Sequence, residues 1–391
     1  MTTVGIDRLY FYTPPYSLPL TTLAEGRGEP TDKYTKGLGQ ITMGIPSPDE
    51  DVVTLAVNAA LPLVNSNDVN NVDTLLFATE SGVDQSKAAG TYLQSLLNLP
   101  SRMRVVELKQ ACYSATAALQ MALAYVRQYP HKQVMVVASD IARYGFNTPG
   151  ESSQGSGAIA MLIKADPDLL VIEPGSGLHT EDVMDFWRPN YRDEALVDGR
   201  HSTKCYLNSL EKTWQHYHEV TARAFHQHDY FCYHVPVPKL VEKAHKHLMR
   251  INDQGSHYSS DIFQQQVGAS LAYCVLAGNC YSASLYVALL SLLANTNDDL
   301  SNKRIGLYSY GSGSVAEYFS AMVLPQYKQY IKKSLYDELL DNRTVLNYKE
   351  YQQFYQYALP TDGSTVTIPQ YLKKGCRLTG MSEHKRHYAL L

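Results

Sequence analysis

Residues 111–115 read Ala-Cys-Tyr-Ser-Ala and residues 279–283 read Asn-Cys-Tyr-Ser-Ala, and each stretch opens a long apolar run. Further along each half of the chain a Gly-Ser-Gly sequence precedes another apolar segment, at residues 155–157 and again at 311–313. Chance would more readily produce one such pair than two in the same order. The sequence therefore predicts a duplicated structural unit.

The segments around these motifs alternate between short apolar runs and helical patterns. Strands buried on both faces are predicted at 72–79, 104–108, 133–139, 230–233 and 304–309, with helices at 50–61 and 87–97. Such alternation favours an α/β architecture. A turn-like sequence, Lys-Ala-Asp-Pro-Asp at 164–168, predicts the boundary between an N-terminal half, residues 1–165, and a C-terminal half, residues 166–391.

The composition excludes several classes of protein. The 391 residues are 45% hydrophobic and 18% charged, which supplies enough apolar material for a packed core. The 34 Lys and Arg against 38 Asp and Glu give a net charge of -4 without a basic stripe, so no nucleic-acid partner is expected. The six cysteines form no Cys-x-x-Cys pair, so neither a disulfide framework nor a metal site is expected.

One stretch has to be weighed as a membrane span. Residues 262–297 contain no Asp, Glu, Lys or Arg, but Gly278, Asn279, Ser282 and Ser284 interrupt the middle of the stretch. We interpret it as a buried helix rather than a transmembrane one. The N-terminus carries no basic segment followed by an apolar run, so no secretory signal is expected and a cytoplasmic location is predicted.

Three side chains follow or precede predicted elements in positions that suit catalysis. Cys112 lies where an apolar helix begins, and free N–H groups at a helix N-terminus favour a thiolate; a small buried core residue is the alternative. Glu80 directly follows a buried strand, where partial burial would raise its pKa into the range of a general base. His234 ends another strand, and a neutral imidazole there can donate to an oxyanion or relay a proton. The Gly-Ser-Gly at 311–313 can bring backbone N–H groups close to a thioester oxygen, or can be a plain turn.

Longer motifs carry a resemblance to a known family over essentially the whole chain. They read ATESGVDQSKAA (78–89), ELKQACYSAT (107–116), SDIARYGFNTPGESSQGSGAIAM (139–161), EDVMDFWRPNY (181–191), FCYHVPVPK (231–239), GNCYSASLY (278–286), YSYGSGSVAEYF (308–319) and SEHKRHY (382–388). The chain resembles hydroxymethylglutaryl-CoA synthases of the bacterial type, which act in the mevalonate pathway. The resemblance implies a thiolase-like fold, with duplicated α/β halves in a five-layered αβαβα sandwich, and a homodimer.

The resemblance also implies roles for individual residues. Cys112 would be acylated by acetyl-CoA, Glu80 would remove a proton from the acetyl methyl group, and His234 would polarise the carbonyl of acetoacetyl-CoA. Residues at family positions that contact the substrates are Tyr144, Ser153, Ser202, Lys239, Lys243, Asn279 and Ser312. Neither a metal nor a redox cofactor is implied, since the CoA thioesters are substrates.

Two departures from the family pattern bear on CoA binding. Family members often carry an aspartate after an early Glu-x-Arg motif, which here reads Glu-Gly-Arg-Gly-Glu-Pro at 25–30. The loop after His234 contains Glu242 where small or basic residues are common, and a carboxylate there would repel phosphate.

Three alternatives stay open. A ketoacyl synthase could use Cys112, His234 and Asn279, but would not need Glu80, and the position three residues after its histidine is Val237 here rather than asparagine. A related synthase would accept carrier-protein thioesters in place of CoA thioesters. A non-catalytic acyl-CoA-binding protein would not need the complete Glu80, Cys112 and His234 set.

Overall fold

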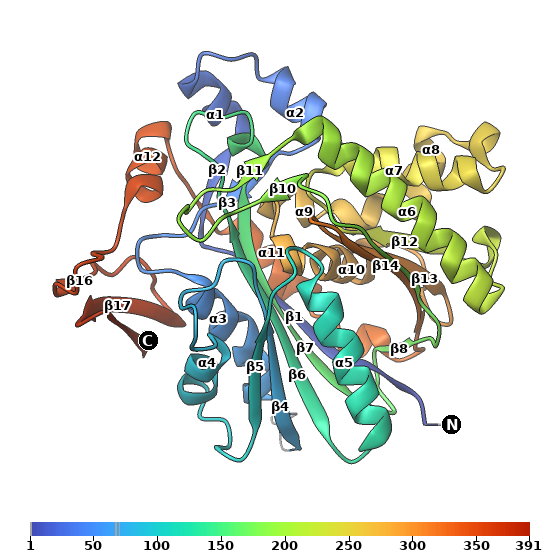
Figure 1. Ribbon diagram of the computed structural model, residues 1–391, viewed down its shortest axis with the longest axis horizontal. Helices are drawn as coiled ribbons and strands as arrows, with labels where there is room; N and C mark the ends of the chain where they lie inside the picture. The colour runs from blue at the N-terminus through green and yellow to red at the C-terminus, as the bar shows by residue number, and fades with distance from the viewer. Residues whose placement is uncertain (1, 67–68, 70) are drawn as a thin grey trace.

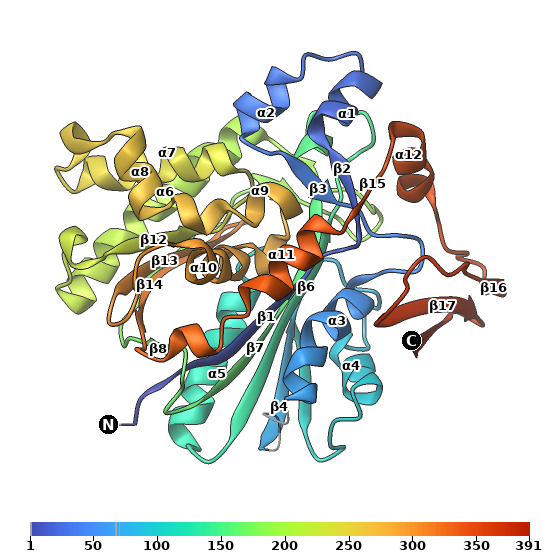
Figure 2. The same ribbon diagram turned by 180° about the vertical axis from the view of Figure 1, so that it is seen from behind.

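A ten-stranded sheet forms the centre of the computed structural model, which describes residues 2–66, 69 and 71–391 (Figures 1 and 2). The strands lie in the order β12 (Tyr230–Tyr233), β13 (Arg304–Gly311), β14 (Val315–Val323), β8 (Leu170–Ile172), β1 (Val4–Tyr12), β7 (Gly155–Ala165), β6 (Gln133–Ala142), β4 (Val72–Ala78) and β5 (Arg104–Leu108), and β9 (Gly177–Thr180) pairs with β14.

The order of the strands confirms the predicted duplication. Strands β1 and β8 pair in the middle of the sheet, and β7 and β14 lie next to them on opposite sides. Further out, β6 and β4 are parallel to each other, as are β13 and β12. The two halves therefore share one strand arrangement, although the position of the boundary between them stays a prediction.

Helices cover both faces of each half of the sheet. The two motif helices, α5 (Ser114–Gln128) and α10 (Ser284–Asn295), belong to one continuous core with the strands of both halves. On the outer faces, α3 (Val52–Asn65) and α4 (Gly90–Leu96) pack against the N-terminal strands, while α6 (Gly199–Thr221) covers β14 (Figures 1 and 2). The layers are those of the predicted thiolase-like sandwich.

The remaining elements surround this core. They are α1 (Leu20–Gly26), α2 (Asp32–Leu38), α7 (Pro238–Ile251), α8 (Ser260–Gln266), α9 (Cys274–Ala277), α11 (Lys333–Asp341), α12 (Tyr348–Gln356), β2 (Tyr16–Pro19), β3 (Thr42–Gly44), β10 (Phe186–Trp187), β11 (Leu196–Val197), β15 (Thr344–Val345), β16 (Val366–Thr367), β17 (Cys376–Ser382) and β18 (Lys385–Leu390). Short 3-10 turns link several of them, including one at Glu151–Ser153 and one at Tyr281–Ala283.

Several predicted elements have different ends in the structure. The helix expected from residue 87 begins at Gly90, because the Asp84 carboxylate accepts hydrogen bonds from the N–H groups of Ser86 and Lys87, both at 2.7 Å, and holds them in a turn. The uncharged stretch 262–297 is not one helix, since α8, α9 and α10 divide it and Gly278 has a φ of 83°. No helix in the described part of the chain is long and apolar enough to cross a membrane.

The two Gly-Ser-Gly motifs bring each half against the cysteine motif of the other half. A Cβ atom on Gly155 would lie 2.5 Å from the backbone nitrogen of Asn279, and a Cβ on Gly311 would lie 2.6 Å from that of Tyr113. Only glycine permits such a close approach of two backbones. The two motifs therefore join one half of the fold to the other, a role that the sequence alone did not reveal.

We expect Gly155→Ala to lower the free energy of unfolding by about 1–3 kcal/mol, because the added methyl group overpacks a contact between two backbones. Gly37→Ala is the matched control, since the nearest atom to a Cβ there is the Asp32 oxygen at 3.8 Å, within helix α2. Alanine should leave that helix as stable or slightly more stable. Urea denaturation of both variants measures the difference, and equal stabilities would contradict the packing argument.

Candidate active site

Glu80 and Cys112 meet at the carboxyl ends of two neighbouring parallel strands. Glu80 lies two residues after β4, and Cys112 lies in the segment between β5 and α5. The Cys112 thiol donates to Oε1 of Glu80, with Sγ and Oε1 3.0 Å apart. Both side chains keep some exposure to solvent. A nucleophile and a carboxylate base thus share one hydrogen bond in an accessible place.

The protonation of Cys112 differs from the sequence-based expectation of a thiolate at a helix N-terminus. Cys112 lies two residues before the first residue of α5, and burial together with the charge of Glu80 raises the pKa of its thiol well above the ordinary value. Burial and the nearby Asp140 raise the pKa of Glu80 to about 8. The thiol is therefore neutral at rest, and a proton on it has a base within hydrogen-bonding distance.

Asp140, at the end of β6, holds the Glu80 segment in place. Its Oδ1 accepts hydrogen bonds from the Glu80 N–H at 2.9 Å, the Thr79 hydroxyl at 2.9 Å and the Ser81 hydroxyl at 2.8 Å. Its Oδ2 accepts from both the N–H, at 3.0 Å, and the hydroxyl of Ser282, which belongs to the second cysteine motif. This fully buried carboxylate connects the base to the other half of the molecule.

Three aromatic rings form a wall beside Cys112. Tyr144, Phe186 and Tyr281 pack edge to face, with ring centroids 5.8 to 6.4 Å apart, and Cys112 contacts the cluster that they form. Burial raises the pKa of the Tyr144 phenol, and a hydrogen bond with the Ser153 hydroxyl opposes that shift. The predicted residues Tyr144 and Ser153 thus lie together on one side of the thiol.

His234 follows β12 as predicted and is almost completely buried. Its N–H donates to the Tyr308 carbonyl at 2.8 Å, and its carbonyl accepts the Tyr206 hydroxyl at 2.8 Å, so the backbone is held from two sides. Burial lowers the pKa of the imidazole to about 3, which keeps the ring neutral. Within the described residues, Nδ1 is buried without a hydrogen-bond partner.

A second buried carboxylate, Asp185, organises the side that holds Ser202 and the second Gly-Ser-Gly. It accepts hydrogen bonds from the Ser202 hydroxyl at 3.0 Å, the Tyr310 hydroxyl at 2.8 Å and the Gly313 N–H at 2.9 Å. The Ser314 N–H donates to the Glu181 carbonyl. The Gly313 and Ser314 N–H groups are therefore already paired within the protein.

Asn279 and Ser312 are hydrogen-bonded to residues near the two cysteine motifs, Asn279 near Cys280 and Ser312 near Cys112. Asn279 is buried, and its Oδ1 accepts from the Tyr281 N–H at 2.9 Å and the Ser284 hydroxyl at 3.0 Å. The Ser312 carbonyl accepts from Nε2 of Gln110, two residues before Cys112, at 3.3 Å. Both residues therefore sit where the two halves meet.

The predicted phosphate contacts lie on the exposed face of α7. Lys239 and Lys243 are exposed, one turn apart, and Lys239 pairs with Glu242 at 2.6 Å. Glu242 is therefore partly neutralised, which weakens the repulsion of phosphate expected from the sequence. Lys239 and Glu242 also line a hollow of about 310 Å³ together with Gly39 of the N-terminal segment. The described contacts join neither these lysines nor His234 directly to Cys112 or Glu80.

Sequence reasoning missed Asp140, Asp185 and Phe186. Asp140 carries the same signal that singled out Glu80, a carboxylate at the end of a predicted buried strand, so it could have been found. Asp185 and Phe186 lie in a segment with little regular structure, and although the motif at 181–191 carries the family resemblance, no periodicity there assigns a role to either residue. Within the described residues, no group of three or more His, Cys, Asp or Glu is placed to hold a metal ion.

Known proteins share both the sequence and the geometry of this chain. Residues 1–168 match the family model described as hydroxymethylglutaryl-coenzyme A synthase N terminal, and residues 170–261 and 251–358 match the corresponding C-terminal model. The chain belongs to the hydroxymethylglutaryl-CoA synthase family. This confirms the resemblance, the thiolase-like fold and the assignment of the chain to the acyltransferases of this family.

Individual relatives agree with the family models. A hydroxymethylglutaryl-CoA synthase from Enterococcus faecalis is 39% identical over 360 residues, which cover 92% of this chain and 93% of the relative. A crystal structure of an HMG-CoA synthase complexed with CoA superposes with a TM-score of 0.94 at 38% identity, and the match covers 100% of both chains. A 3-hydroxy-3-methylglutaryl-ACP synthase of polyketide biosynthesis from Bacillus subtilis is 32% identical, covering 91% of this chain and 89% of the relative.

The raised pKa of Glu80 predicts a pH-dependent cost to stability. Between its ordinary value of 4.5 and about 8, the folded protein holds a proton that the unfolded chain releases. Stability contributed by this group is therefore lost as the pH rises through that window, by up to about 1.4 kcal/mol per pH unit. Glu80→Gln should remove the loss, and its gain in stability over the wild type should grow from pH 5 to pH 8.

Thermal or urea unfolding at several pH values measures this slope. Glu25→Gln serves as the control, because Glu25 is an exposed carboxylate near the end of α1. If Glu80→Gln and the wild type lose stability in parallel from pH 5 to pH 8, the pKa of the Glu80 carboxyl is not raised in the folded protein.

Proposed function

We propose that this protein condenses acetyl-CoA with acetoacetyl-CoA and hydrolyses the resulting enzyme thioester, releasing 3-hydroxy-3-methylglutaryl-CoA and CoA. The contact between the Cys112 thiol and the Glu80 carboxylate, at 3.0 Å, is the observation that carries this proposal. It places the nucleophile that the first substrate needs next to the base that the carbon–carbon bond needs. Membership of the hydroxymethylglutaryl-CoA synthase family supports the same reaction.

The first step is transfer of the acetyl group to Cys112. The sulfur adds to the carbonyl of acetyl-CoA, the bond from that carbonyl to the CoA sulfur breaks, and CoA leaves. Because the resting thiol is neutral, its proton is released during this step and ends on the departing CoA sulfur, which leaves as the CoA thiol. Holding the acetyl group on the enzyme makes the next step effectively intramolecular.

In the second step Glu80 removes a proton from the acetyl methyl group. A carboxylate with a pKa near 8 is a stronger base than an ordinary glutamate, and this suits the weak acidity of a thioester α-proton. The hydrogen bond that the Glu80 N–H donates to Oδ1 of Asp140 fixes the position of the base while its charge changes. The resulting carbon nucleophile then attacks the ketone carbon of acetoacetyl-CoA.

His234 would act on that ketone. A neutral imidazole can donate its N–H to the oxygen that becomes an alkoxide, and burial keeps this ring neutral over the working pH range. Water then adds to the remaining Cys112 thioester, the C–S bond breaks, and the product acid forms as the thiol is restored. We assign the contacts with the acyl chains to Tyr144, Ser153, Ser202, Asn279 and Ser312, and the contacts with CoA phosphates to Lys239 and Lys243.

CoA thioesters are proposed over carrier-protein thioesters on the basis of similarity. The chain is 39% identical to the Enterococcus faecalis CoA enzyme and 32% identical to the Bacillus subtilis synthase named for an acyl carrier protein. The paired Glu80 and Cys112 also oppose a decarboxylating ketoacyl synthase, which would make its carbanion without a base. Turnover with CoA thioesters, compared with the same acyl groups on a holo carrier protein, distinguishes the two substrate classes.

We further propose that the protein is a cytoplasmic homodimer. Strand β5 forms one edge of the large sheet, and Val106 at its centre is 50% exposed. An exposed strand edge of this kind invites pairing with another chain. Sedimentation of the purified protein measures its oligomeric state.

Cys112 should form one covalent acetyl adduct with acetyl-CoA. Intact mass spectrometry should show the mass of a single acetyl group on the wild type, and none on Cys112→Ala. Cys280→Ala is the matched control, because Cys280 occupies the same place in the second motif but is only 1% exposed. That variant should still take up one acetyl group, and an adduct surviving on Cys112→Ala would disprove the assignment.

Glu80→Gln should form the acetyl-enzyme and then stall before condensation. The glutamine removes the charge that raises the pKa of the thiol, so loading of Cys112 does not depend on the base. Condensation should fall at least the ~10²–10⁴-fold typical of a lost general base. The measurement is single-turnover condensation of pre-acetylated enzyme with acetoacetyl-CoA.

Glu107→Gln is the control for this experiment. Glu107 lies on the neighbouring strand β5 and accepts a hydrogen bond from the Ala89 N–H at 2.7 Å, without contacting Cys112. It should condense at close to the wild-type rate. Undiminished condensation by Glu80→Gln would remove Glu80 from the mechanism and favour the ketoacyl synthase alternative.

A further inference from the structure

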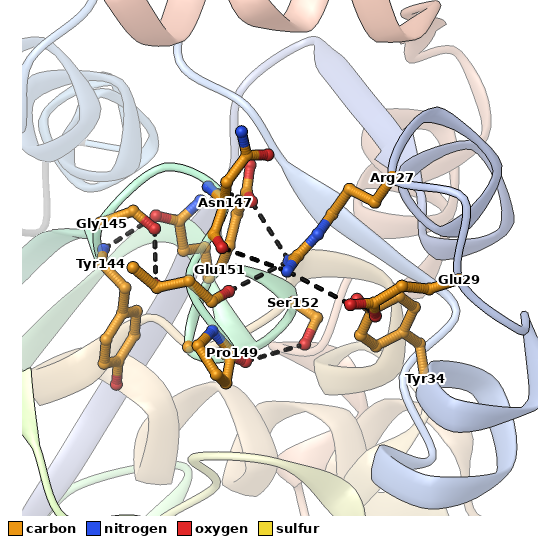
Figure 3. Close-up of polar contacts among 12 residues, drawn as sticks. Arg27, Glu29, Tyr34, Tyr144, Gly145, Asn147, Pro149, Glu151 and Ser152 are labelled. Atoms are coloured by element: carbon orange, nitrogen blue, oxygen red, sulfur yellow. Dashed lines mark hydrogen bonds and ion pairs between the residues drawn. The ribbon is translucent and has the colours of Figure 1, made fainter.

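A set of polar side chains, most of them buried, joins three segments that are far apart in the sequence. Figure 3 labels Arg27 and Glu29 of the first segment and Glu151 of the second. We call the set of Arg27, Glu29, Glu151, Gln154 and Tyr351 the Glu151 network. Its centre, Glu151, has a side chain with no exposure to solvent, although it carries a carboxylate. Burial of a charge is costly unless it is paired and hydrogen-bonded, so such a group has to be explained.

Arg27 supplies the charge that pairs with Glu151. Its guanidinium lies 3.3 Å from Glu151 and 3.5 Å from Glu29, and it donates to the carbonyls of Thr148 at 3.0 Å and Asn147 at 3.3 Å. The side chain is only 9% exposed. Arg27, from the early motif that departs from the family pattern, is thus directed into the protein, where it holds the segment that follows β6 (Figure 3).

From Glu151 the hydrogen bonds lead to the backbone of Tyr144. The Tyr351 hydroxyl donates to Glu151 at 2.7 Å and accepts from Nε2 of Gln154 at 3.1 Å. The Gln154 Oε1 then accepts the Tyr144 N–H at 2.8 Å. Tyr355, one turn further along α12, donates to the Tyr144 carbonyl. Both polar groups of the Tyr144 backbone are therefore held by α12 or by a residue bonded to it.

The ring of Tyr144 points away from Arg27 and Glu151 (Figure 3). It belongs to the aromatic wall that Cys112 contacts. Tyr144 packs edge to face against Phe186 and Tyr281, so three aromatic rings lie beside the thiol. An acetyl group on Cys112 would lie against this wall. Exclusion of water from such a site is what protects a reactive thioester from hydrolysis before it condenses.

We propose that Glu151 and Tyr351 are positioning residues that hold Tyr144 against Cys112, so that the acetyl-enzyme condenses before water reaches it. This inference rests on the proposed function, since it concerns the fate of the acetyl group on Cys112. In the competing reaction water adds to the thioester carbonyl and the C–S bond breaks. Acetate and the free thiol form, and no other reactant is needed.

Tyr351→Phe tests the inference with the loss of one hydroxyl group. The variant keeps the ring but leaves Nε2 of Gln154 without its acceptor and Oε1 of Glu151 without the Tyr351 donor, while Oε2 of Glu151 keeps its contacts with Asn147 and Arg27. Acetate and hydroxymethylglutaryl-CoA are both measured from enzyme loaded with labelled acetyl-CoA and mixed with acetoacetyl-CoA. The ratio of acetate to product should rise roughly 3- to 30-fold, within the coupling found between members of one hydrogen-bond network. The rate of Cys112 acetylation should stay close to that of the wild type.

Tyr336→Phe is the matched control, because Tyr336 is also fully buried and its hydroxyl donates to a backbone carbonyl, that of Leu9, at 3.1 Å. It should lower stability to a similar degree without changing the ratio. Glu151→Gln should raise the ratio as Tyr351→Phe does. Its NH₂ group is a donor and would face two other donors, the Asn147 N–H and the Arg27 guanidinium, where the wild type has an acceptor oxygen.

A double variant shows whether the effect passes through Tyr144. Tyr144→Ala removes the ring itself and should raise the ratio, and adding Tyr351→Phe should then change it no further. The inference is overturned if Tyr351→Phe acetylates normally with an unchanged ratio, or if its effect is as large without the Tyr144 ring. Failure of the wild type to acetylate at all would instead overturn the proposed function, and this inference with it.

Discussion

The close contact of two glycines with the opposite half of the molecule is the constraint on which the site depends. Gly155 approaches the backbone of Asn279, and Gly311 approaches the backbone of Tyr113, so closely that a Cβ atom would meet a backbone nitrogen at 2.5 and 2.6 Å. Each contact presses the strand end of one half against the cysteine motif of the other half. Because of this exchange, Asp140 of β6 reaches Ser282 and Glu80 at the same time. Glu80 and Cys112 could not be fixed relative to the second half without it.

The sequence predicted the parts of the site that depend on local structure. Glu80 and His234 were found because each ends a buried strand, and Cys112 because it precedes an apolar helix. The α/β architecture and the duplication followed from the same patterns. The ends of the elements were less predictable, since side chains such as that of Asp84 decide where a helix begins. The predicted lowering of the pKa of the Cys112 thiol was wrong in direction, because burial and then three acidic groups from distant segments raise it.

The tertiary parts of the site could not be predicted from local patterns. Asp185 and Phe186 lie in a segment with little regular structure, and their partners come from residues 202, 281 and 310–313. The reason for the 30 tyrosines of the chain also becomes visible only in the tertiary structure. Most of the largest fully buried side chains are tyrosines, and two of them, Tyr34 and Tyr351, donate their hydroxyls to the carboxylates of Glu29 and Glu151. A tyrosine adds apolar area to a core and also satisfies a buried acid, which a phenylalanine cannot do.

The two cysteine motifs show why the surroundings decide the chemistry rather than the motif. Cys112 and Cys280 stand in the same short sequence at the start of equivalent helices, and burial raises the pKa of both thiols. Cys280 is 1% exposed, and its sulfur faces the carbonyl of Gly278, which cannot accept a proton permanently. Cys112 keeps access to solvent and faces Glu80, so a carboxyl group lies beside the acetyl group that this thiol would carry. The two thiols therefore differ in their neighbours rather than in their motif: the carboxylate that follows β4 places a base beside one copy, while the other copy is a buried packing residue.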